Sequence, residues 1–122
     1  MAHTFEELSQ RAIEAAIDVH RQLGPGFLES IYENAMKIAL RKRGIAFEFQ
    51  KDVPVYYEGE EVGLHRTDLI VENAMVLELK AIKALEDIHF AQLRSYLKAT
   101  GLHVGLLLNF NAPKLLIKRV VL

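Results

Sequence analysis

Hydrophobic residues recur at helical spacing in two stretches of the first third of the chain. The first stretch follows a Thr-Phe-Glu-Glu capping-box sequence at residues 4–7 and ends near Leu23. A Gly-Pro-Gly sequence at residues 24–26 interrupts the pattern, and the second stretch runs from Leu28 to a stop at Gly44. The pattern therefore predicts two helices joined by a turn.

The spacing changes to strand-like alternation in the middle of the chain. Between residues 47 and 57, aromatic and β-branched side chains recur with a period of two at Phe47, Phe49, Val53, Val55 and Tyr57. This pattern predicts one strand, with Pro54 indicating an edge or a bulge. Residues 62–71 and 75–82 are two further segments, separated by a short Glu-Asn-Ala sequence typical of a turn. These two segments predict a β-hairpin.

One more helix and two strands are expected in the last third of the chain. Helical periodicity covers about residues 85–100 and stops at Gly101, whereas residues 103–110 and 114–122 are strand-like. The predicted order is ααβββαββ, an α/β fold. A chain of 122 residues is long enough to bury one core, so we expect residues 1–122 to form a single domain.

The predicted hairpin brings together side chains that carry chemistry. If its loop has three residues, Val71 pairs with Met75, and counting back along both strands places Asp68 opposite Glu78. Alternation then puts both carboxylates on one face with Lys80, and the apolar residues Leu69, Val71, Met75, Leu77 and Leu79 on the other face. A loop one residue shorter would separate the carboxylates, so the hypothesis depends on this turn.

Two carboxylates that face each other on neighbouring strands lie roughly 5 Å apart at Cβ and repel unless a positive charge is close. The sequence has no cysteine, which excludes disulfides and thiolate zinc sites and leaves oxygen ligands for a hard cation. Mg²⁺ or Mn²⁺ fits such ligands and leaves positions open for phosphate oxygens. Lys80 could then orient a water or stabilise charge on a phosphate.

The alternative is a solvated face on which these charges form cross-strand ion pairs. The same register places Arg66 opposite Lys80, so each carboxylate would have a basic neighbour. Ile70 and Val76 lie on this face as well, which favours partial burial and makes an unpaired carboxylate costly.

Charge and composition limit the partners of this domain. The formal net charge is −1, so any nucleic-acid contact must be local. A hydrophobic share of 51% allows for an apolar surface buried in a homodimer or larger homo-oligomer. Residues 1–7 lack the pattern of a signal peptide, and no stretch is apolar for long enough to span a bilayer, so we expect a cytoplasmic protein without membrane contact.

Four elements resemble a known family. Asp68, nine intervening residues and Glu78-Leu79-Lys80, between a leading and a following helix, resemble the core of the PD-(D/E)xK nuclease superfamily. Gln92 and Tyr96 match the Q-x-x-x-Y element of its RecB-like branch. Residues 26–32 carry the Gly-x-x-Glu-x-x-Tyr signature of the GxxExxY proteins, which are similar to that superfamily. The resemblance covers nearly the whole chain and implies a restriction-endonuclease-like mixed central sheet flanked by helices.

The resemblance also implies roles for residues. It makes Asp68 and Glu78 the primary metal ligands, Lys80 the catalytic amine, and Glu29 a further ligand or water-holding residue. Further candidates are Gln92 and Tyr96 as catalytic or substrate-orienting residues and His20 as a metal ligand. The structural alternatives are a helix-dipole contact for Glu29 at the first turn of its helix and a core position for Tyr32. Thr67 stands where the superfamily name has proline, which removes no ligand.

Two functions follow from these residues. The first is a Mg²⁺- or Mn²⁺-dependent phosphodiesterase that cleaves DNA or RNA by water attack. The second is a non-catalytic module that keeps a nuclease-like fold for nucleic-acid binding or self-assembly. Metal binding separates them, because only the first requires an intact carboxylate site.

Overall fold

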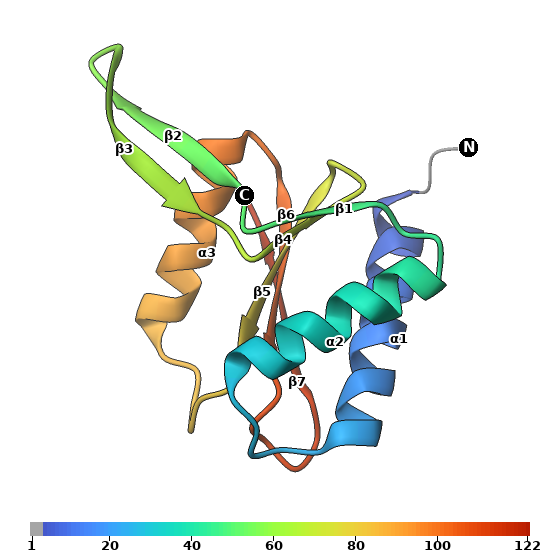
Figure 1. Ribbon diagram of the computed structural model, residues 1–122. Helices are drawn as coiled ribbons and strands as arrows, with labels where there is room; N and C mark the ends of the chain where they lie inside the picture. The colour runs from blue at the N-terminus through green and yellow to red at the C-terminus, as the bar shows by residue number, and fades with distance from the viewer. Residues whose placement is uncertain (1–3) are drawn as a thin grey trace.

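The computed structural model describes residues 4–122, which form a mixed sheet with helices on both faces (Figure 1). The helices are α1 (Phe5–Leu23), α2 (Glu29–Lys42) and α3 (Asp87–Thr100). The strands are β1 (Phe47–Phe49), β2 (Asp52–Tyr57), β3 (Glu60–Arg66), β4 (Leu69–Val71), β5 (Met75–Lys80), β6 (Val104–Asn109) and β7 (Leu116–Val121). The three predicted helices and the mixed α/β class are confirmed.

Local sequence signals explain where α1 begins and ends. The side chain of Thr4 accepts a hydrogen bond from the backbone N–H of Glu7 (3.1 Å), and the Glu7 carboxylate accepts one from the backbone N–H of Thr4 (3.1 Å). This is the predicted capping box. At the other end Gly24 has a φ of 71°, a conformation that favours glycine and ends the helix.

The main sheet has the strand order β1-β4-β5-β6-β7. Strands β5 and β6 are parallel and α3 connects them, whereas the other neighbours are antiparallel. The loop at residues 72–74 has three residues, because Val71 pairs with Met75 and Leu69 with Leu77. The register on which the expected site depends is therefore confirmed.

The two faces of the sheet are buried by different helices. Strand β5 sends Met75, Leu77 and Leu79 into a core that also contains α1 and α2. Val76 alternates to the opposite face, where it joins a smaller cluster with Leu93 of α3. Within the described part of the chain, no helix is long and apolar enough to cross a membrane.

Two strands expected between residues 47 and 71 are broken, which the periodicity did not predict. Gln50 adopts a φ of 50° and donates its N–H to the carbonyl of Asp68 (2.7 Å), and the N–H of Thr67 donates to the carbonyl of Lys51 (3.1 Å). These hydrogen bonds join the two segments to each other at the level where both strands are interrupted. The observed order is therefore ααβββββαββ.

The distal halves, β2 and β3, form a separate two-stranded hairpin that extends from the main sheet beside α3 (Figure 1). Pro54 lies in this hairpin next to a register shift at Val55, as its sequence indicated. The expected position of Arg66 opposite Lys80 is wrong. The break carries Arg66 away with β3, and its Nε lies 2.9 Å from Oδ1 of Asp52 instead.

Candidate active site

The break between β3 and β4 places Asp68 where regular pairing with β5 stops. Its Oδ2 accepts a hydrogen bond from the backbone N–H of Leu79 (3.0 Å), so the side chain replaces a ladder partner of β5. In the other direction, the N–H of Asp68 donates to Oε1 of Glu78 (3.2 Å). The predicted proximity of Asp68 and Glu78 is thus present, and backbone contacts on both sides hold it.

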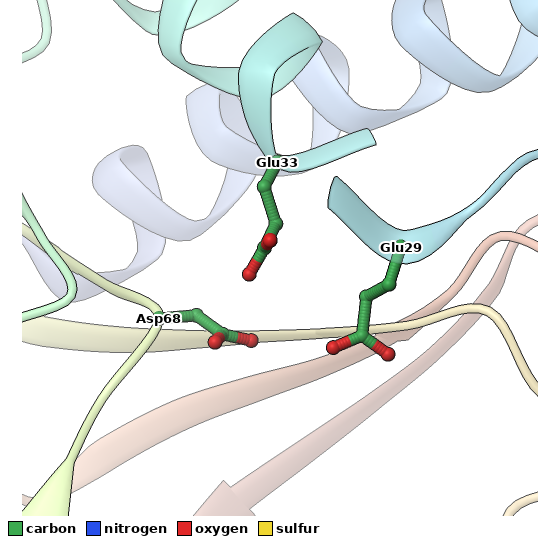
Figure 2. Close-up of side chains that lie close together, drawn as sticks. All are labelled: Glu29, Glu33 and Asp68. Carbon is green, nitrogen blue, oxygen red and sulfur yellow. The ribbon is translucent and has the colours of Figure 1, made fainter. Parts of the chain in front are cut away.

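Helix α2 adds two further carboxylates, Glu29 and Glu33. Each offers an oxygen that lies within 4.8 Å of the other and of an oxygen of Asp68. Figure 2 shows the three side chains converging, two from α2 and one from the segment before β4. Glu33 was missed in the sequence analysis, although its i, i+4 spacing from Glu29 places both on one face of a helix.

Burial opposes negative charge throughout this group. Burial, and next to it the charge of Asp68, raises the pKa of Glu78 to about 8, and Glu78 is only 2% exposed. The same two causes raise the pKa of Glu33 to about 7. Burial also raises the pKa of Asp68 and of Glu29. Such a group favours a proton or a cation among its oxygens.

Lys80 supplies a positive charge at this place. Its Nζ lies 3.9 Å from Oε2 of Glu78, and its side chain is largely buried. The charge of Lys80 lowers the pKa of Glu29, Asp68 and Glu78, against the larger effect of burial. The ammonium therefore lies within electrostatic reach of three of the four carboxylates, as the E-x-K sequence indicated.

Helix α3 brings Tyr96 to the same region. Its ring packs against that of His65 with centroids 3.9 Å apart. Burial, and then the charges of Glu78, Asp68 and Glu29, raises the pKa of Tyr96 to about 12. Tyr96 thus keeps its proton at neutral pH. Gln92 lies one turn earlier on α3 and is half-buried.

His20 has a different environment from the carboxylates. Its ring is buried near that of Phe110, and Nε2 lies 2.8 Å from the carbonyl oxygen of Ala112. Among residues 4–122, the group with metal-ligand spacing consists of the three carboxylates of Figure 2 and does not include His20. The structure thus gives this nitrogen a carbonyl partner of its own.

Comparison with known proteins agrees with this geometry. Residues 6–120 match the family model described as the PD-(D/E)XK nuclease superfamily. The chain belongs to this superfamily. The resemblance to the superfamily and the restriction-endonuclease-like fold are thereby confirmed, whereas the resemblance to the GxxExxY proteins stays a prediction. Members of the superfamily typically use divalent metal ions, which the acidic cluster of this chain would suit.

A solved structure shows the same fold. The crystal structure of SSO0001 is 20% identical in sequence and superimposes with a TM-score of 0.61 over 75% of this chain. The match covers 48% of that protein, so this chain spans about half its length. No curated protein matches the sequence.

Proposed function

We propose that the protein is a divalent-metal-dependent phosphodiesterase that acts on DNA or RNA. The observation that carries this proposal is the convergence of Glu29, Glu33 and Asp68 within 4.8 Å, beside the buried Glu78 and Lys80, in a chain of the PD-(D/E)XK superfamily. A cluster of buried like charges is costly on its own, and a function that requires it explains why it is there.

The donor set fits Mg²⁺ or Mn²⁺, because it consists of carboxylate oxygens. Glu29, Glu33 and Asp68 would hold the ion, with Glu78 beside Asp68. When bound, such an ion lowers the pKa of a water and neutralises charge on a phosphate oxygen. Because burial raises the pKa of all four carboxylates, we expect ion binding to release protons at neutral pH.

Two side chains around the carboxylates have roles in this proposal. Lys80 places its ammonium where it can orient the attacking water and stabilise negative charge on the phosphoryl group. Tyr96 keeps its proton and can donate a hydrogen bond to a substrate oxygen. Gln92, one turn away on α3, can orient the substrate from the same helix.

Cleavage assays test the proposal directly. The wild-type protein is incubated with labelled single-stranded DNA, duplex DNA and RNA in Mn²⁺ or Mg²⁺, and we expect cleavage of at least one substrate. Asp68→Ala and Lys80→Ala should each abolish it, whereas Lys118→Ala, an exposed lysine on β7, should not. Cleavage that persists in both site variants would contradict the assignment.

A second candidate function is a binding or self-assembly module without catalysis. The hairpin formed by β2 and β3 favours it, because Tyr56, Tyr57, Val62 and Leu64 are each more than 60% exposed there. This candidate requires no metal. Calorimetric titration with Mn²⁺ separates the two functions, and light scattering measures self-association.

A further inference from the structure

Tyr32 closes the loop that leads into α2. The tyrosine is fully buried, and its ring stacks on Phe110 with centroids 4.7 Å apart. Its hydroxyl donates a hydrogen bond to the carbonyl of Gly24 (2.6 Å) and accepts one from the N–H of Phe27 (3.2 Å). One side chain of the helix therefore holds both ends of the loop before it.

This contact matters because α2 begins without a side-chain cap. The residue at the cap position is Leu28, which makes no side-chain hydrogen bond and is 73% exposed. The first turn of a helix frays unless something replaces the missing cap. Glu29 is the first residue of α2, so its position depends on the loop that Tyr32 fastens.

On the sheet side, Glu29 lies beside the backbone that follows β5, and the end of β6 holds that backbone in place. The backbone N–H of Ala81, directly after Lys80, lies close enough to the Glu29 carboxylate to lower the pKa of that group, against the larger effect of burial. The buried Asn109 holds the next residue, Ile82, by its N–H (3.2 Å) and by its carbonyl (3.0 Å). Phe110, which follows Asn109, is the residue on which Tyr32 stacks. The end of β6 thus supports both the loop before Glu29 and the backbone that Glu29 contacts.

We propose that Tyr32 is a positioning residue, which holds Glu29 against Ala81 and among the carboxylates of the metal site. This inference rests on the proposed function only in so far as the site binds a metal. Both hydrogen bonds of the Tyr32 hydroxyl go to the backbone. Tyr32 therefore acts through Glu29 and has no direct contact with ion or substrate.

The test is a double-mutant cycle of Tyr32→Phe and Glu29→Gln, read by calorimetric titration with Mn²⁺. Tyr32→Phe keeps the ring that stacks on Phe110 and removes both hydrogen bonds. We expect a loss of Mn²⁺ affinity of about tenfold, the range for groups that orient a ligand. In the Glu29→Gln background the same substitution should cause no further loss, because the group it positions is gone. An equal loss in both backgrounds, or none in the wild type, would overturn the proposal.

A second measurement does not require a metal. Amide hydrogen exchange at Ala81 reports whether the Glu29 carboxylate stays beside that amide, and the hydrogen bonds of the Tyr32 hydroxyl go to Gly24 and Phe27 instead. We expect faster exchange at Ala81 in Tyr32→Phe and in Glu29→Gln, and no additional increase in the double variant. Unchanged exchange at Ala81 in Tyr32→Phe would contradict the positioning role, whereas a wild-type protein that fails to bind Mn²⁺ would contradict the proposed function alone.

Two controls separate positioning from stability. Tyr57→Phe removes an exposed hydroxyl of the β2–β3 hairpin and should leave both readouts unchanged. Val120→Ala opens a small cavity on the α3 face and lowers the melting temperature without touching the loop. If Val120→Ala weakens Mn²⁺ binding as much as Tyr32→Phe does, loss of stability explains the effect and the positioning role is wrong.

Discussion

The face of the main sheet that packs on α1 and α2 differs from the face that packs on α3. Of the described residues, 20 buried apolar side chains join the first core and six join the second. Glu78 lies two residues after Val76 on β5 and so points to the same, smaller side. The site thus combines Glu29 and Glu33 of α2, a helix of the larger core, with Glu78 on the smaller side. We infer that the larger core supplies the stability that keeps these carboxylates together.

The largest effect is expected at Glu78, where one substitution should change activity and stability in opposite directions. Glu78→Gln keeps an oxygen for the N–H of Asp68 but removes the charge, so we expect cleavage to fall on the order of a thousandfold. At pH 9, where Glu78 is ionised, the metal-free variant should be more stable than the wild type, because a buried charge is gone.

Single-turnover cleavage and urea denaturation measure the two quantities. A Glu78→Gln variant that is both less active and less stable would show that the carboxylate is a structural element of the smaller face.

Substitutions at the neighbouring residues Leu106 and Leu107 allow a direct comparison of the two cores. Both are buried on β6, Leu106 in the larger core and Leu107 in the smaller one opposite Glu78. Replacing either with alanine should cost about 2–5 kcal/mol of unfolding free energy, with the larger loss for Leu106. Only Leu107→Ala should also reduce cleavage, since it loosens the support beside Glu78.

Chemical denaturation and cleavage rates of the two alanine variants check this prediction. Equal losses of activity at equal stability would mean that the two faces do not differ in function.

A smaller effect is expected from pH, and its sign follows from the pKa of Glu78. The folded state raises the pKa of Glu78 from 4.5 to about 8, so it keeps a proton that the unfolded chain has lost. Stability therefore falls as the pH rises through about 8. Burial lowers the pKa of His65 from its usual value of 6.5. Stability therefore rises with pH as His65 loses its proton, and this gain is complete above pH 6.5.

The informative window is thus pH 6.5–8.5 in the absence of metal. Thermal denaturation of the wild type should show a decline of at least about 1 kcal/mol there, and Glu78→Gln a clearly smaller one. A wild-type protein whose stability rises across this window would contradict the burial of charge at Glu78.

The smallest effect is expected outside both cores. Tyr57 on the β2–β3 hairpin is 68% exposed, and Tyr57→Ala should change the unfolding free energy by no more than about 0.5 kcal/mol. Thermal denaturation measures it. A much larger loss would show that the hairpin contributes to the core on the α3 face.

Much of the fold could be predicted because its signals are local. The capping box at Thr4 and the glycine at Gly24 depend on neighbours in the chain. The register of β4 and β5 follows from a loop of three residues. That register alone predicted Asp68 beside Glu78 and Lys80, whereas Glu29 was a candidate only through the family resemblance.

The breaks at Gln50 and Asp68 could not be predicted in this way. Gln50 takes a positive φ there, and its partner across the break is Asp68, which lies in another predicted strand. The predicted position of Arg66 opposite Lys80 was wrong for the same reason. A strand pattern specifies which face a residue takes, but not where two strands leave the sheet together.

The sequence by itself determined the helices, the hairpin register and the E-x-K chemistry, because each depends on spacing within one or two adjacent elements. Only the tertiary structure decided that α2 packs with Glu29 and Glu33 facing Asp68, and that Tyr32 fastens the start of that helix. Burial also shifts the pKa of these carboxylates, and burial is a property of packing that no local pattern contains.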